Sequence, residues 1–227
     1  MKISKILLST ALLLITVLFS VNQAGATTVE FNMNVEYSGG TEPEGPDPWA
    51  TATFVDSGSN NVTLTMSAAN LVDSEFISVW QFNFDPDLDP DLLEFTLLGE
   101  PGSTPDISTG SDAFKAGPDR FYDIEFDFPP PKGNYENKFT TGETVVYDIT
   151  YTGSEIIDVY SFSFQSTSDK HGGPFYSAAH IQSIGRKGKS GWVGAPTVVP
   201  EPVSSTLFIV GGLALGFRRF VKKRKTH

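Results

Sequence analysis

The stretch of this sequence that is richest in groups able to do chemistry is a run of aspartates separated by prolines. It reads Asp85-Pro86-Asp87-Leu88-Asp89-Pro90-Asp91, with a carboxylate at every second position. Carboxylate oxygens are hard ligands of the kind that calcium prefers. The candidate calcium ligands are therefore Asp85, Asp87, Asp89 and Asp91, although the run lacks the glycine and closing glutamate of an EF-hand loop. The Asp-Pro pairs favour a simpler interpretation, two turns in which the carboxylates accept hydrogen bonds from backbone N–H groups.

Histidine is the residue type whose charge changes most readily near neutral pH. Between the two ends of the chain only His171 and His180 occur, and neither lies in a G-x-S-x-G or H-E-x-x-H motif. We expect His180 to be a strand histidine bonded to backbone, and two histidines without cysteine argue against a zinc site. We therefore predict no catalytic residue, no enzyme activity and no cofactor other than the calcium considered above. Glycoside hydrolysis by a carboxylate pair is the alternative. Acidic residues are so abundant here that the sequence does not single out such a pair.

Tryptophan side chains are the candidates for contact with carbohydrate, because an indole ring offers a large apolar face and a polar N–H group. Trp80 lies inside an apolar run and is predicted to be core. Trp49 and Trp192 flank loops rich in glycine and proline, so we expect them at an exposed surface.

Alternating apolar and polar residues, the pattern of half-buried strands, dominate the chain between its two ends. The pattern is clear at 29–37, 62–66, 122–128, 145–151 and 160–164, and turn-rich segments separate these runs. A change of phase at Val79–Trp80 predicts a β-bulge. About nine short strands predict an all-β domain over residues 27–195, built as an antiparallel β-sandwich, with a closed barrel as the main competitor.

The charge of this domain is strongly acidic. The chain has 27 acidic and 16 basic residues, and every acidic residue except Glu201 lies within 27–195, whereas half of the basic residues lie outside it. Such a charge argues against a nucleic-acid partner. The absence of cysteine excludes disulfide bonds and thiol catalysis.

The N-terminal end has the layout of a secretory signal peptide. Lys2 and Lys5 precede an apolar run over 6–19, and Ala24-Gly25-Ala26 follows with small residues. This order predicts export and cleavage after Ala26, with residues 1–26 removed as a signal helix. A retained membrane anchor is the alternative, but the apolar run is short for a span.

The C-terminal end predicts a second membrane segment. Residues 196–202 form a proline-containing linker, and residues 203–227 hold an apolar run at 207–217 followed by a basic tail. Flanking cations keep a tail of this kind in the cytoplasm, which leaves residues 27–195 outside the inner membrane. The cations of the tail are Arg218, Arg219, Lys222, Lys223, Arg224 and Lys225.

The order of Val199-Pro200-Glu201-Pro202, a glycine-bearing apolar helix and an arginine-rich end resembles the PEP-CTERM protein-sorting signal. The resemblance implies that Pro200, Glu201 and Pro202 form the recognition and cleavage region for an exosortase-like membrane protease. The segments Ala178-Ala179-His180 and Gly191-Trp192 resemble the body of one recurrent group of such proteins, from which no activity carries over. A plain single-pass tail anchor is the alternative to a sorting signal.

Together these features predict an exported bacterial protein that is held transiently in the inner membrane and then released to the cell surface or extracellular matrix. We expect a non-catalytic structural or adhesive role associated with exopolysaccharide. The alternatives are a secreted glycoside hydrolase and a calcium-dependent carbohydrate-binding module.

Overall fold

The structure is a computed structural model, and it describes residues 26–118, 120–128, 138–167 and 174–200. Ala24, Glu201, Pro202, the basic tail from Arg218 to Lys225 and the two hydrophobic ends predicted above lie outside these ranges, as does His171. Within the described ranges, no helix is both long enough and apolar enough to cross a membrane.

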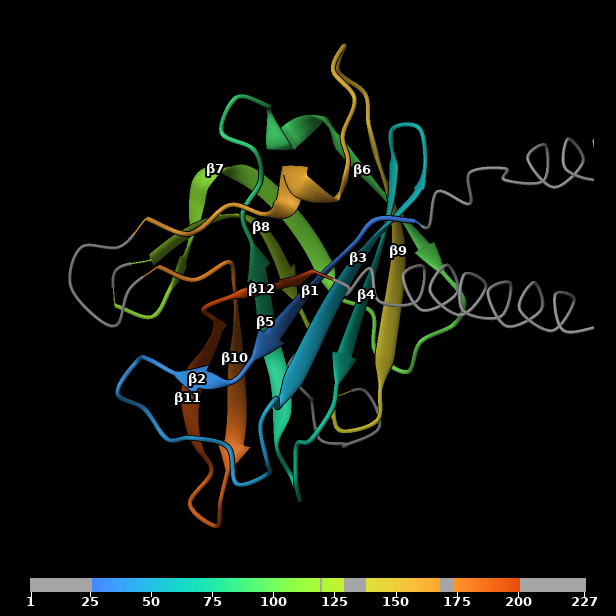
Figure 1. The fold of residues 1–227 in the computed structure, drawn as a ribbon. Helices are drawn as coiled ribbons and strands as arrows, with labels where there is room; N and C mark the ends of the chain where they lie inside the picture. Colours follow the sequence, from blue (N-terminus) through green and yellow to red (C-terminus); the bar gives the residue numbers. More distant parts are fainter. Residues whose placement is uncertain (1–25, 119, 129–137, 168–173, 201–227) are drawn as a thin grey trace, which may run out of the picture.

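The described residues form two antiparallel six-stranded sheets that pack face to face as a β-sandwich (Figure 1). This confirms the predicted fold class, with more strands than the nine expected. Sheet A has the order β12-β1-β3-β4-β9-β6, and sheet B has the order β2-β11-β10-β5-β8-β7. The strands are β1 (Thr28–Met33), β2 (Val35–Glu36), β3 (Ala50–Gly58), β4 (Asn61–Ala68), β5 (Phe76–Phe82), β6 (Leu93–Leu98), β7 (Asp106–Ala116), β8 (Arg120–Asp127), β9 (Thr144–Tyr151), β10 (Ser177–Ile184), β11 (Lys189–Ala195) and β12 (Val198–Pro200).

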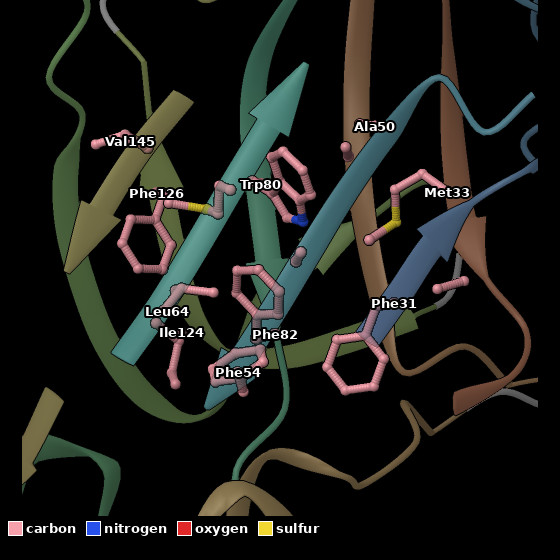
Figure 2. Packing of buried hydrophobic residues seen from close by; sticks show 14 of the residues in the cluster. Phe31, Met33, Ala50, Phe54, Leu64, Trp80, Phe82, Ile124, Phe126 and Val145 are labelled. Carbon is pink, nitrogen blue, oxygen red and sulfur yellow. The ribbon is translucent and has the colours of Figure 1, made fainter. Parts of the chain in front are cut away.

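Aromatic side chains from both sheets fill the space between them. Phe31, Phe54, Phe82 and Phe126 are each fully buried, and Figure 2 shows them packed with Trp80 in the central cluster. The Phe82 ring meets the rings of Phe54 and Phe126 edge-to-face, at centroid distances of 5.3 and 5.8 Å. The alternation in sequence becomes alternation in burial, because successive strand residues point to opposite faces of a sheet.

Two local features of the strand prediction have clear outcomes. The bulge is confirmed beside the predicted position: Ile181 pairs with Ile77 and His180 with Val79, so Ser78 is the additional residue of β5. The strand predicted at 160–164 is wrong, because Val159–Phe162 forms a 3-10 helix, η3. Its capping box explains the difference, since Asp158 accepts from the N–H of Ser161 while Ser161 Oγ accepts from the N–H of Asp158.

The segment predicted as a linker also contributes to the fold. Val198–Pro200 forms β12, which pairs with β1 at the edge of sheet A. An edge strand is a position that tolerates proline, because a backbone N–H there need not bond to a neighbouring strand. The sandwich therefore extends to the first proline of the Pro-Glu-Pro sequence.

Candidate functional site

A cavity of about 330 Å³ opens at the end of β5 and is the candidate functional site. We call it the Asp123 pocket. Its walls come from four segments: the residues that follow β5 with the aspartate-proline run, an irregular part of β7, Asp123 of β8, and residues 164–167 after η3. The polar lining residues are Asn83, Asp85, Ser111, Asp112, Asp123, Gln165 and Thr167, and the apolar ones are Phe84, Pro86, Leu88, Pro90 and Phe164.

Asp123 joins two walls of the pocket through its carboxylate. Its Oδ2 accepts from the Phe84 N–H at 2.9 Å, and its Oδ1 accepts from the Asp112 N–H at 2.7 Å. The pKa of Asp123 is raised overall. Burial, the largest effect, raises this pKa, the hydrogen bonds from the N–H groups of Asp112 and Phe84 lower it, and the nearby Asp112 carboxylate raises it further. Because both oxygens are held by main-chain donors, this carboxylate fixes the shape of the pocket.

The irregular part of β7 places a second aspartate at the pocket. The register of β7 against β8 shifts between Thr109 and Phe114, and Asp112 within this interval has φ of 49°. Aspartate is one of the few residue types other than glycine that adopt this left-handed conformation readily. The conformation directs the Asp112 N–H to Asp123, and the Asp112 side chain lines the cavity.

The aspartate-proline run forms two successive turns, which is the arrangement that its residues favour in sequence. Asp85 Oδ1 accepts from the Asp87 N–H at 3.0 Å, and Asp89 Oδ1 accepts from the Asp91 N–H at 3.0 Å. Asp89 also caps the short 3-10 helix η1 (Pro90–Leu92). The backbone conformation of the run is therefore set by its own carboxylates.

The calcium prediction gains no support from this arrangement. Over the described ranges, no group of three or more His, Cys, Asp or Glu residues converges as a metal site would require. Asp91 points to β7, where its Oδ1 accepts from Thr109 Oγ1 at 2.8 Å. Calcium needs six to eight oxygen ligands around one point, and these carboxylates are spread along the run in separate turns.

The burial of the tryptophan side chains agrees only partly with the prediction. Trp80 is fully buried and its Nε1–H donates to Ser177 Oγ at 2.9 Å, which confirms a core position. The exposed position predicted for Trp49 is wrong: this residue is 2% exposed, with Nε1–H donating to the Gly45 carbonyl at 2.7 Å. The loop that carries Gly45 folds back over the ring, which a count of nearby glycines and prolines does not reveal. Trp192 is half-buried.

His180 lies against Trp192 on the face of sheet B that points away from sheet A. The two rings stack at a centroid distance of 4.8 Å. His180 Nδ1 lies 3.1 Å from Ser78 Oγ and 3.4 Å from Gln182 Nε2, so its partners are side chains and not the backbone groups expected from sequence. Burial lowers the pKa of His180 and favours the neutral ring. The bulge in β5 explains the contact, because the additional residue Ser78 stands beside His180.

A buried arginine is the main feature that the sequence prediction missed. Arg120 is fully buried, and its guanidinium carbon lies 4.0 Å from the ring centroid of Tyr37 and 4.8 Å from that of Phe175. Burial raises the pKa values of Tyr37 and Tyr122 beside it, so both phenols stay neutral. A signal was present, because Arg120 is in phase with the buried positions Tyr122 and Ile124 of β8. Tyr37, Tyr122 and Phe175 belong, with Ala116 and Ala178, to a second core cluster near the end of the β7–β8 hairpin.

The fold and the pocket together define a cysteine-free β-sandwich with an acidic cavity at the end of sheet B. Comparisons with protein-family models, with curated protein sequences and with solved structures find no match to this chain. Of the predicted processing residues, Ala26 is exposed just before β1, and Pro200 ends β12.

Proposed function

We propose that this chain is an exported surface or matrix protein that binds neutral exopolysaccharide through the Asp123 pocket without cleaving it. An exosortase-like protease acting at Pro200-Glu201-Pro202 would release it from the inner membrane, as the resemblance to PEP-CTERM proteins implies. The observation that carries the binding role is the Asp123 pocket, whose lining combines acceptor oxygens and amide groups with apolar side chains.

The chemistry of the lining suits a hydroxylated ligand. Sugar hydroxyl groups donate to carboxylate oxygens such as those of Asp85 and Asp112, and they accept from amide groups such as that of Gln165. The C–H face of a sugar ring packs on apolar surfaces, which Pro86 and Phe164 provide. Three aspartates at one cavity repel anionic polymers, so the preferred ligand is uncharged.

The position of Asp123 favours binding over hydrolysis. A general acid must present a protonated oxygen to the glycosidic bond, and a nucleophile must present a free one. Both oxygens of Asp123 instead accept hydrogen bonds from main-chain N–H groups. Hydrolysis remains the second candidate function, because Asp85, Asp112 and Asp123 line one cavity and burial raises the pKa of Asp123.

The test of the pocket is calorimetric titration with neutral and acidic oligosaccharides prepared from the host's exopolysaccharide. Asp112→Asn keeps the backbone N–H to Asp123 and removes one charged acceptor, so affinity for the neutral ligand should fall roughly tenfold. Asp73→Asn is the matched control, since Asp73 is exposed, has φ of 52° and is not a pocket residue. Equal affinity of the two variants, or no binding by the unaltered chain, contradicts the proposed pocket.

Two further measurements address catalysis and sorting. Release of reducing ends from the polysaccharide, abolished in Asp123→Asn, would replace the binding role with the hydrolase. The intact mass and location of the protein in its host test sorting. A surface or medium form that lacks residues 1–26 and 204–227 agrees with processing. A full-length mature chain that stays in the inner membrane would instead make the C-terminal tail a simple anchor.

A further inference from the structure

The chain enters and leaves the sandwich at the same place. β1 begins at Thr28 and β12 ends at Pro200, and the two strands are antiparallel, with Val29 opposite Pro200. Figure 1 shows β1 and β12 side by side at the edge of sheet A. The chain beyond Pro200 therefore starts where the chain before Thr28 finishes.

The same end of the sandwich carries the two most exposed large hydrophobic side chains of the described residues. Ile156 is 70% exposed and Tyr160 is 61% exposed, whereas the next most exposed one is 40% exposed. Two hydrogen bonds hold their segment against the β3–β4 hairpin: the Val159 N–H donates to Asp56 Oδ1 of β3 at 2.9 Å, and the Ile157 N–H donates to Asn60 Oδ1 in the turn at 3.2 Å. The Asp56 N–H donates in turn to the Thr27 carbonyl at 3.0 Å. We call the end of the sandwich that carries Thr27, Ile156 and Tyr160 the end face.

The sequence places an apolar segment very close to the end face. Only residues 201–206 separate Pro200 from the apolar run that begins at Leu207. Six extended residues span about 20 Å at most. If the run at 207–217 enters a bilayer, as the proposed function requires, the end face is held next to the surface of that bilayer.

We infer that the end face docks on the lipid surface while the chain is anchored, with Ile156 and Tyr160 inserted at the interface. An aliphatic side chain and an amphipathic aromatic ring are residue types that favour this depth of a bilayer. The acids beside them select the kind of surface. In the sequence Glu155 precedes Ile156 and Asp158 lies between Ile156 and Tyr160, and both acids are exposed, so a bilayer of uncharged zwitterionic lipid is preferred and anionic lipid weakens docking. This inference rests on the proposed anchoring by residues 203–227.

The test uses the chain from residue 27 to 227 in phosphatidylcholine vesicles that contain acyl-chain nitroxide quenchers. Because the chain has no cysteine, Glu155→Cys and Lys187→Cys each provide one site for a fluorescent label. Glu155 adjoins Ile156, whereas Lys187 lies in the exposed turn between β10 and β11 at the opposite end of the sandwich (Figure 1). The label at 155 should be strongly quenched and the label at 187 should not.

A second variant links quenching to the two side chains. Adding Ile156→Ser and Tyr160→Ser to Glu155→Cys should lower the docked fraction roughly tenfold, and both positions are exposed, so folding is preserved. Unquenched label at 155 in a chain that floats with the vesicles overturns docking alone. Equal quenching with and without the two serines overturns the role of Ile156 and Tyr160. A chain that does not float with vesicles overturns both docking and the proposed anchoring.

Discussion

Val29 and Pro200 lie opposite each other in antiparallel strands β1 and β12, which brings the two ends of the sandwich together at one edge of sheet A. Val29 is buried and follows shortly after Ala26, the predicted cleavage position. Pro200 is the first residue of the Pro-Glu-Pro sequence. The two proposed processing positions therefore flank one pair of hydrogen-bonded strands, and either cut can be made without entering the core.

The first prediction concerns the stability that β12 contributes. Val198 packs against the main core, whereas Val199, its neighbour in the strand, is 40% exposed. Val198→Ser should lower the free energy of unfolding by about 1 kcal/mol, because it removes partly buried apolar surface. Val199→Ser, the matched control, should change it by less than about 0.5 kcal/mol. Urea unfolding of residues 27–200 measures both, and equal effects would show that β12 does not pack as described.

The second prediction concerns Asp123 as the residue that fixes the pocket. Asp123→Ala leaves the N–H groups of Phe84 and Asp112 without their acceptor and should cost about 2 kcal/mol of unfolding free energy. Asp123→Asn keeps one acceptor oxygen and should cost less. Denaturant unfolding at pH 7 measures the order, and an asparagine variant less stable than the alanine variant would contradict this account.

Sequence alone predicts the sandwich because burial follows alternation so closely. In β4, for example, every second residue from Val62 is buried, so the residue pattern is sufficient to assign its core face. Sequence fails where a local contact decides the conformation. Residues 160–164 alternate like a strand, but the capping box at Asp158 and Ser161 forms a 3-10 turn instead.

Only one part of the candidate site, the aspartate-proline run, can be predicted from the sequence. The aspartate-proline run is recognisable, and its turn chemistry follows from Asp-Pro preferences. Asp123 is not distinguishable from the other alternating acids of β8, because its role depends on a shift of register in β7 that brings Asp112 beside it. Such a contact between strands is a product of packing and leaves no local pattern.

The third prediction tests the loop that buries Trp49. A side chain at Gly45 would overlap the backbone carbonyl of Asn70, so Gly45→Ala must displace that loop and should cost about 2 kcal/mol or more. Gly58→Ala is the control, since a Cβ at Gly58 would meet only Asn61 Cβ, at 3.9 Å. Thermal unfolding gives the stability, and a red shift of tryptophan emission in Gly45→Ala alone would indicate exposure of Trp49. Unchanged stability in Gly45→Ala would mean that the loop does not pack against Asn70 as described.

The fourth prediction concerns the pH dependence of stability that His180 causes. Burial lowers its pKa in the folded state below the ordinary value of 6.5, so the folded chain binds fewer protons than the unfolded chain just below that pH. The contribution of neutral His180 is therefore present above pH 6.5 and is lost as the pH falls from 6.5 through the lowered pKa. His180→Asn does not titrate, so the unaltered chain should lose stability relative to this variant between pH 7 and pH 5. Urea unfolding at the two pH values gives the difference, and an NMR titration of the His180 ring provides an independent check. A ring that titrates above pH 6.5, or equal pH dependence in the two proteins, would mean that Trp192 and Ser78 favour the charged ring instead.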